Sequence, residues 1–157
     1  MARRSRYPEN NKLVSFSEHS VRVGIYARLS EADGDNVISD SILNQIAIAH
    51  KHIEFCQNFA YVKTYIDDGY TGRNYNRPGF IEMMEDLRSG IINCVIVKDV
   101  SRIGRNYKEV GDLLTKKFAE MEVRFVSINN DYDSINDEAG MPKVSFLLQT
   151  VFDDQVS

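Results

Sequence analysis

The stretch VRVGIYARLS, residues 21 to 30, decides the fold of this chain. Its first seven residues show the apolar pattern of a buried β-strand, and the stretch then presents an arginine, Arg28, and a serine, Ser30. Packing alone does not require a guanidinium group and a hydroxyl at the end of such a strand. We therefore expect the end of this strand to carry a function.

The size and composition of the chain indicate one globular domain. It has 157 residues, of which 43% are hydrophobic and 27% are charged. No apolar run approaches the roughly 18 residues that a membrane-spanning helix needs. Residues 1–20 are basic and polar and lack the apolar centre of a signal peptide. We expect a cytoplasmic protein without membrane contact, with a flexible arm over residues 1–20.

Charge and cysteine usage narrow the classes of function. The formal net charge of −4 argues against a broad basic surface for nucleic acid, so any DNA contact must be local or be made by another part of the protein. Cys56 and Cys94 are 38 residues apart in apolar segments, which is typical of buried free thiols. No histidine has the acidic or thiol neighbours of a metal site, so we expect no metal.

Strand and helix patterns alternate along the chain. The predicted strands lie at residues 21–27, 60–67, 92–99 and 123–131, and the predicted helices at 41–59, 78–89, 108–121 and 141–157. This order predicts an α/β fold with three layers, in which a mainly parallel sheet has helices on both faces. No capping or breaking residue closes the last pattern, so we expect it to be the start of a long C-terminal helix that has been cut.

Polar residues follow the predicted strands at one edge of the sheet. Ser30 follows the first strand, Asp67 and Asp68 follow the second, and the segment DVSRIGRN, residues 99–106, follows the third. In parallel sheets, reaction sites lie outside the carboxyl ends of the strands. We expect these residues to gather there.

Arginines dominate this edge, and their chemistry suits a phosphodiester. Guanidinium groups bind phosphate oxygens in pairs and stabilise the additional negative charge of a pentacovalent transition state. A serine among them would be the nucleophile. No histidine is placed to act as its base, which argues against a Ser-His-Asp hydrolase.

Four short motifs resemble a known family. YARLS at 26–30, Asn44 with Gln45, NRPGF at 76–80 and VSRIGRN at 100–106 together resemble the catalytic domain of serine recombinases, specifically the large ones that act as transposon or phage integrases. The resemblance covers residues 21–157. It implies a serine that attacks a DNA phosphate, forms a covalent 5′-phosphoserine link and releases a 3′-hydroxyl, without metal or nucleotide cofactor.

The resemblance also implies the residues of the site. It gives one serine nucleophile, four arginines, a polar residue on the following helix and an acidic residue after the second strand. In this order they are Ser30, Arg28, Arg77, Arg102, Arg105, Gln45 and Asp67. Small resolvases have an aspartate directly before the first arginine of the RxGR segment, where this chain has Ser101, so no general acid is implied at that position.

The resemblance further implies an organisation and partners. Residues 21–140 would form the catalytic domain, and residues 141–157 would begin a truncated linker or dimerisation helix. The partners would be DNA and further copies of the protein, as a homodimer and as a tetramer at synapsis. Because the sequence-reading module lies downstream in this family, we expect these residues alone to bind DNA weakly.

Two other classes of function remain open. A metal-dependent nuclease of similar layout would use Asp67, Asp68 and Asp99 to hold Mg²⁺. A flavodoxin-like receiver or ligand-binding module would bind a small anion at the same edge, although the chain lacks a GxGxxG or Walker pattern.

Structural roles also remain open for single residues. Ser30 could merely end the strand, and Gln45 could be a polar residue on a helix face. Arg77 could form a salt bridge with a glutamate of the following helix. The arginines at 102 and 105 could be a solvated pair at the start of a helix.

Overall fold

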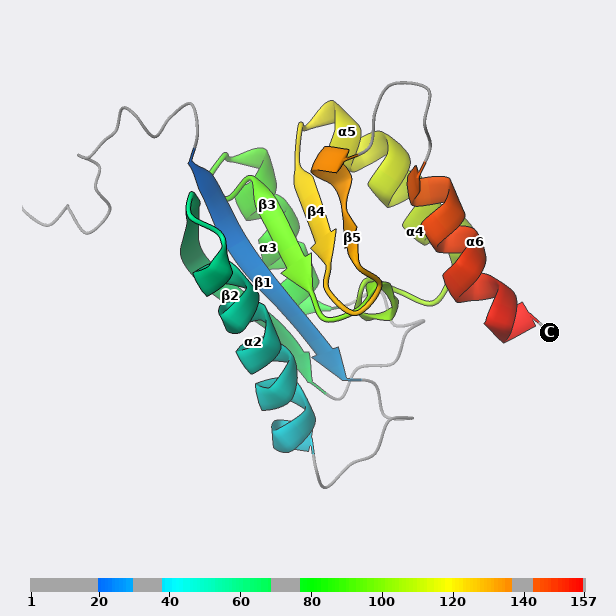
Figure 1. The fold of residues 1–157 in the computed structure, drawn as a ribbon, viewed down its shortest axis with the longest axis horizontal. Helices are drawn as coiled ribbons and strands as arrows, with labels where there is room; N and C mark the ends of the chain where they lie inside the picture. Colours follow the sequence, from blue (N-terminus) through cyan, green and yellow to red (C-terminus); the bar gives the residue numbers. More distant parts are fainter. Residues whose placement is uncertain (1–19, 30–37, 69–76, 137–142, 157) are drawn as a thin grey trace, which may run out of the picture.

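A five-stranded sheet forms the centre of the molecule (Figure 1). The computed structural model describes residues 20–29, 38–68, 77–136 and 143–156. The strands are β1 (Val21–Leu29), β2 (Phe59–Asp68), β3 (Cys94–Val97), β4 (Arg124–Ser127) and β5 (Tyr132–Asp133). The helices are α2 (Ile38–Phe55), α3 (Pro78–Arg88), α4 (Tyr107–Asp112), α5 (Phe118–Glu120) and α6 (Lys143–Val156). Shorter elements are the 3-10 turns η3 (Val100–Arg102) and η5 (Ser134–Asn136) and the π-helical segment η4 (Leu113–Lys117).

The strand order is β2-β1-β3-β4-β5, and the sheet is mainly parallel, as predicted. The pairs β1 with β2, β1 with β3, and β3 with β4 are parallel, whereas β5 pairs antiparallel with β4. The short strand β5 falls between the predicted strand at 123–131 and the predicted helix at 141–157. Two residues are too few to show the alternation of apolar and polar residues by which a strand is predicted. This strand forms because the two residues pair with β4 in the folded structure.

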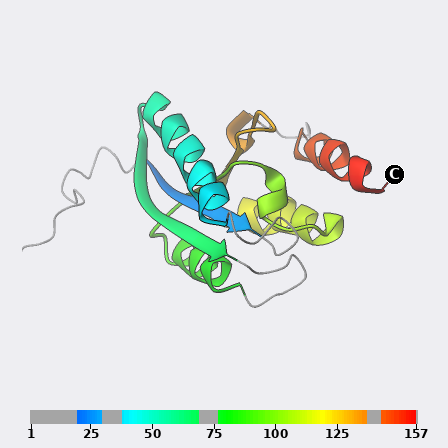
Figure 2. The ribbon, with the colours of Figure 1, turned by 90° about the horizontal axis from the view of Figure 1, so that it is seen from below.

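Helices cover both faces of the sheet, which confirms the three-layer prediction (Figure 2). Helix α2 covers one face, where it packs on alternate residues of β1 such as Val23, Ile25 and Ala27. Helices α3 and α4 pack on the other face, against residues such as Tyr26 and Val95, and α6 packs against α4. Since side chains alternate along a strand, Arg28 shares its face with Tyr26, on the side of α3.

The ends of several elements differ slightly from the sequence prediction. Helix α2 ends at Phe55, four residues early, because Phe59 begins β2 instead. Gly90 has a positive φ of 80° just beyond α3, a conformation typical of the glycine that follows a helix. The predicted helix 108–121 is continuous but contains the π-helical segment η4.

Two further expectations concern thiols and membranes. Both cysteines are free thiols, with Cys94 buried and Cys56 half-buried. Among the described helices, none is both long and apolar enough to cross a membrane. The proposed arm over residues 1–20 lies almost wholly outside the described residues, and so does Ser30.

Candidate active site

The carboxyl ends of β1 and β3 form the switch point of the sheet, where the chain leaves on opposite sides. Strand β1 lies between β2 and β3, so its end is flanked by the segments that follow both of them. Arg28 pairs in register with Asp67 of β2. Such a switch point is where α/β sheets form their binding crevices. The structure thus brings three of the predicted segments to one edge.

Arg28 and Arg102 hold each other through reciprocal hydrogen bonds. The Arg28 Nε donates to the Arg102 carbonyl at 2.8 Å, and an Arg102 terminal nitrogen donates to the Arg28 carbonyl at 3.0 Å. A second nitrogen of Arg28 donates to the Ser101 carbonyl at 2.6 Å. The Arg28 side chain is 1% exposed. Its guanidinium is therefore held against turn η3 instead of extending into solvent.

Gln45 fixes the backbone of Arg28 from the opposite face. Its side-chain oxygen accepts from the Arg28 amide at 3.1 Å, and its amide nitrogen donates to the Arg28 carbonyl at 3.2 Å. Gln45 is 1% exposed. It is therefore a buried link between the face of α2 and the end of β1.

Asp67 caps helix α3 from the end of β2. Its two carboxylate oxygens accept from the amides of Gly79 at 2.7 Å and Phe80 at 2.9 Å. The Tyr26 hydroxyl donates to the same carboxylate at 2.7 Å. A carboxylate at a helix N-terminus satisfies amides that have no partner within the helix. Asp67 thereby ties α3 to the sheet at the switch point.

Gly79 makes this cap possible. A Cβ atom at this position would lie 2.7 Å from the Ile66 carbonyl oxygen and 3.0 Å from an Asp67 carboxylate oxygen. No side chain fits without moving β2 or α3. The Pro-Gly pair of the NRPGF motif therefore starts the helix in contact with the edge of the sheet.

Arg77 precedes α3 and lies over two aromatic rings. Its guanidinium carbon is 4.4 Å from the centre of the Phe80 ring and 6.0 Å from that of Tyr26. Arg77 is 9% exposed and makes no side-chain cap of the helix. Glu82, one of the expected salt-bridge partners, bonds to Lys63. Aromatic packing thus places Arg77 beside the Tyr26–Asp67 pair.

Several arginine side chains bring positive charges close together in the site. Burial lowers the pKa of Arg28, and the charges of Arg77, Arg105 and Arg102 lower it further, partly against the effect of Tyr26. Within the described residues, one terminal nitrogen of Arg28 and one of Arg77 are buried without a hydrogen-bond partner. Buried cationic donors of this kind require an acceptor. An anion with several oxygens meets that requirement.

The predicted site residues divide into three groups. Arg28, Gln45, Asp67, Arg77 and Arg102 surround the switch point. Arg105 is exposed but acts electrostatically on Arg28. Ser30 lies outside the described residues, directly after the end of β1. The sequence predicted no role for Tyr26, Phe80 or Asn130, although Tyr26 lies in the YARLS motif and Phe80 in the NRPGF motif.

Two of the three carboxylates at this edge, those of Asp67 and Asp99, accept hydrogen bonds, whereas Asp68 is exposed. Both oxygens of Asp67 accept backbone amides, and an oxygen of Asp99 accepts from Ser101. In the part of the chain that the structure describes, no three His, Cys, Asp or Glu side chains are grouped as metal ligands would be. The arrangement provides cationic donors for an anion.

Comparisons with known proteins agree on one family and fold. The family described as "Resolvase, N terminal domain" matches residues 23–152. The N-terminal catalytic domain of TP901-1 integrase has a TM-score of 0.66 at 22% identity, covering 85% of this chain and 95% of that chain. A resolvase family site-specific recombinase from Streptococcus pneumoniae has a TM-score of 0.63 at 23% identity, covering 86% and 90%.

A third structure is similar over a smaller part of the chain. The serine recombinase from Sulfolobus solfataricus has a TM-score of 0.55 at 22% identity, covering 70% of this chain and 69% of that chain. Among curated proteins, none matches. At these identities the likeness to solved structures establishes the shared fold, and the match of the family covers most of the sheet and its helices.

Proposed function

The chain belongs to the resolvase N-terminal domain family, the catalytic domain of serine recombinases, and we propose that it cuts and rejoins DNA at specific sites through a covalent 5′-phosphoserine. One observation carries the proposal most strongly. Arg28 and Arg77 each bury a guanidinium nitrogen without a hydrogen-bond partner among the described residues, at the strand end that leads into Ser30. A DNA phosphate supplies the missing acceptors.

In this proposal Ser30 is the nucleophile. Its Oγ loses its proton and forms a bond to phosphorus, the bond from phosphorus to the 3′-oxygen breaks, and the leaving oxygen takes up a proton to become a 3′-hydroxyl, so no net proton is consumed. Rejoining reverses the step when a 3′-hydroxyl attacks the phosphoserine. Because one phosphoester replaces another, the energy of the bond is retained without a nucleotide cofactor.

The arginines hold the phosphate and stabilise its transition state. Arg28 and Arg77 each offer it the guanidinium nitrogen that has no partner in the described part of the chain, and Arg102 contributes from turn η3. The exposed Arg105 adds positive charge and reaches the flanking DNA. A positive field also favours the ionised form of a nearby hydroxyl, which would activate Ser30.

Gln45 and Asp67 act on the phosphate indirectly, through the arginines that they hold in place. Gln45 holds the backbone of Arg28, and Asp67 holds the helix start that carries Arg77. Both are therefore positioning residues in this proposal. Their loss would displace an arginine and leave its charge intact.

The wider setting of the domain is part of the same proposal. Residues 21–140 act as the catalytic unit, and residues 141–157 begin a linker or dimerisation helix. DNA is bound locally, with further affinity supplied by downstream parts of the protein. Copies pair as dimers and as a tetramer at synapsis, in the cytoplasm, during excision or integration of a mobile element.

The experiment is a search for the covalent intermediate. The protein expressed from its complete gene is incubated in EDTA with duplex DNA that spans the two flanks of that gene, then denatured. We expect protein attached to 5′ ends with wild type and none with S30A. Ser89, an exposed residue at the far end of α3, provides the control S89A, which should form the adduct normally.

The opposite result would remove the proposal. If wild type cut this DNA without an adduct, and only with added Mg²⁺, a metal-dependent nuclease would be the better assignment. If S30A formed the adduct, another residue would be the nucleophile.

A further inference from the structure

Asp99 links several parts of the site through one carboxylate oxygen. This oxygen accepts from the Ser101 amide at 3.2 Å and from the Ser101 hydroxyl. The same oxygen lies 3.5 Å from the Arg102 Nε. Asp99 is thus the N-cap of turn η3 and also the ion-pair partner of an arginine in the site.

Turn η3 in turn determines where the Arg28 guanidinium points. The carbonyls of Ser101 and Arg102 accept from two of its three nitrogens, at 2.6 and 2.8 Å. A guanidinium is planar and rigid. Once two nitrogens are bound, the direction of the third follows, and that third nitrogen is the buried one that has no hydrogen-bond partner among the residues that the structure describes.

Strand β4 anchors the same turn from a different side. The Asn130 side-chain oxygen accepts from the Val100 amide at 3.0 Å and also from the Ser127 hydroxyl. This contact fixes the first residue of η3 to the sheet. The Asp99 contacts fix the next two, whose carbonyls bind Arg28.

We infer that Asp99 is a positioning residue for strand transfer, which orients the Arg28 and Arg102 guanidinium groups toward the phosphate through turn η3. The inference rests on the function proposed above and adds a residue to its site. Asp99 touches neither the phosphate nor Ser30 in this role. Its oxygen must be in place, and the reaction does not require it to exchange a proton.

The variants separate geometry from charge. D99A removes the oxygen, and D99S keeps a short capping oxygen that favours folding but cannot reach Arg102. D99N keeps an acceptor at full reach without the charge. The matched control is D133N, because Asp133 is 21% exposed and bonds Arg124, much as Asp99 is 22% exposed and pairs with Arg102.

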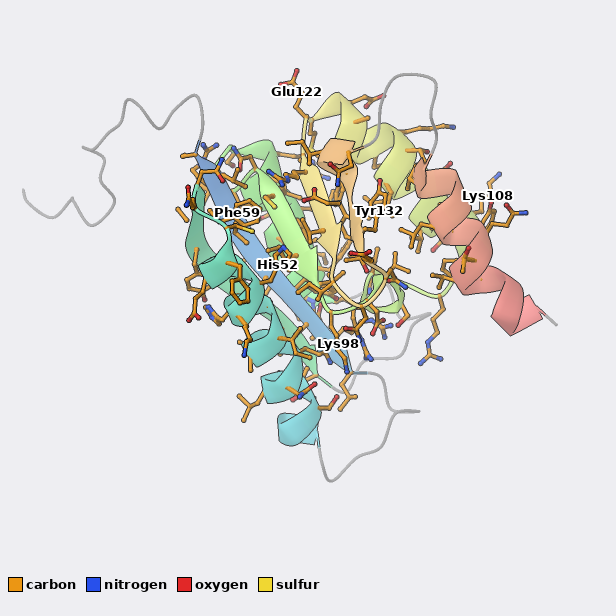
Figure 3. All side chains as sticks on the ribbon, in the orientation of Figure 1. His52, Phe59, Lys98, Lys108, Glu122 and Tyr132 are labelled. Carbon is orange, nitrogen blue, oxygen red and sulfur yellow. The ribbon has the colours of Figure 1, made fainter. Side chains whose placement is uncertain are left out.

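The arginine that pairs with the control residue lies at the opposite end of the sheet from the site. Arg124 begins β4, and its guanidinium is 4.8 Å from the centre of the Phe59 ring at the start of β2. Figure 3 labels Phe59 and also Lys98, which directly follows β3 at the edge that holds the site. A loss of stability alone would therefore slow the reaction in variants of both aspartates, whereas a loss of positioning would slow it only in the variants of Asp99.

The measurement is the rate of Ser30 adduct formation at saturating DNA, with the DNA affinity measured separately. The probe is the duplex that spans the flanks of the gene. We expect D99A and D99S to slow the adduct by roughly 10- to 100-fold with unchanged affinity, since small displacements of catalytic groups have effects of that order. D99N should recover most of the rate with the pH profile of wild type, and D133N should react like wild type.

A second readout is independent of the DNA. In NMR spectra, the Nε–Hε signals of Arg28 and Arg102 should move in D99A and return close to their wild-type positions in D99N. If wild type forms no adduct, the proposed function fails while these signals still test the inference. Unmoved signals, a wild-type rate in D99A or D99S, or a displaced pH profile in D99N would each overturn the positioning role.

Discussion

Arg28 and Arg102 each donate a side-chain hydrogen bond to the other's backbone carbonyl, at 2.8 and 3.0 Å. Arg28 lies near the end of β1, and Arg102 lies in turn η3, which follows β3, so this double contact links the ends of the two strands. Each arginine is placed by the backbone of the other. A substitution at either position therefore changes both the charge of the site and the geometry of its partner.

The first prediction concerns R28K. Lysine keeps the charge, but its single ammonium cannot bind two carbonyls and also present a nitrogen to phosphate. We expect the free energy of unfolding to fall by about 1–3 kcal/mol, because the carbonyls of Ser101 and Arg102 lose hydrogen-bond donors. Adduct formation should fall roughly 100-fold or more, as expected for loss of one transition-state donor. Urea unfolding and adduct rates measure the two effects.

The control for R28K lies on the same strand. Arg22 is also in β1, at the end away from the site, where it donates to the Gly90 carbonyl in an exposed contact. R22K should change stability by less than about 0.5 kcal/mol and leave the adduct rate unchanged. Equal effects of R22K and R28K would contradict a specific role for Arg28.

The second prediction compares two glycines. In G79A the new Cβ would meet the Ile66 carbonyl at 2.7 Å, so α3 must shift away from β2. We expect a loss of about 1–3 kcal/mol and a slower reaction, because Arg77 moves with the helix start. In G111A the nearest side-chain atom would be at an ordinary 3.4 Å, so this helical position should gain about 0.5–1 kcal/mol. Thermal unfolding of both variants measures these changes in stability. A G79A variant as stable as wild type would contradict the close approach of residue 79 to the Ile66 carbonyl.

The third prediction concerns alkaline pH and Tyr26. Burial raises its pKa above the ordinary value of 10.0, and although the Arg77 charge opposes this, the hydrogen bond to Asp67 adds to it. The folded state thus favours the protonated phenol. This stability is fully present below pH 10 and decreases above it, because the unfolded chain ionises there while the folded chain does not.

The Y26F variant isolates this effect. At pH 8 it should be less stable than wild type by about 1 kcal/mol, the contribution of one buried hydrogen bond. Above pH 10 the difference should shrink, since only wild type gains from ionisation of this residue on unfolding. Urea unfolding at several pH values measures the difference. A difference that stays constant, or grows, between pH 8 and 11 would contradict the raised pKa.

Much of the fold was predictable because its signals are local. The apolar run before Arg28 and the spacing of Ile42, Ile46 and Ala49 predict a strand and a helix, and alternation of such elements predicts a parallel sheet. The pair Tyr132–Asp133 carries no such signal. It becomes strand β5 because it pairs with Val126 and Ser127 of β4, and the bonds of Asp133 to Arg124, at 2.7 and 2.9 Å, support this pairing. Contacts of that kind depend on the folded structure.

The same distinction applies to the site. Residue type and the edge rule identified Arg28, Arg77 and Arg102 as a group. They did not reveal that Asp67 would bond the amides of Gly79 and Phe80, since this depends on where α3 begins relative to the end of β2. The motif letters point to residues that matter, whereas their partners follow from packing.

The last prediction tests the cap directly with D67N. Three donors meet this carboxylate, namely the amides of Gly79 and Phe80 and the Tyr26 hydroxyl. An asparagine has one acceptor oxygen, so its NH₂ group must face at least one backbone amide. We expect the free energy of unfolding to fall by about 1–3 kcal/mol, with a lower adduct rate.

Because the Tyr26 hydroxyl donates to the same carboxylate, the effects of D67N and Y26F should be non-additive in a double-mutant cycle of unfolding free energies. Additive effects would mean that the Tyr26 hydroxyl and the Asp67 carboxylate contribute independently, and a stable D67N with a normal rate would remove Asp67 from the site.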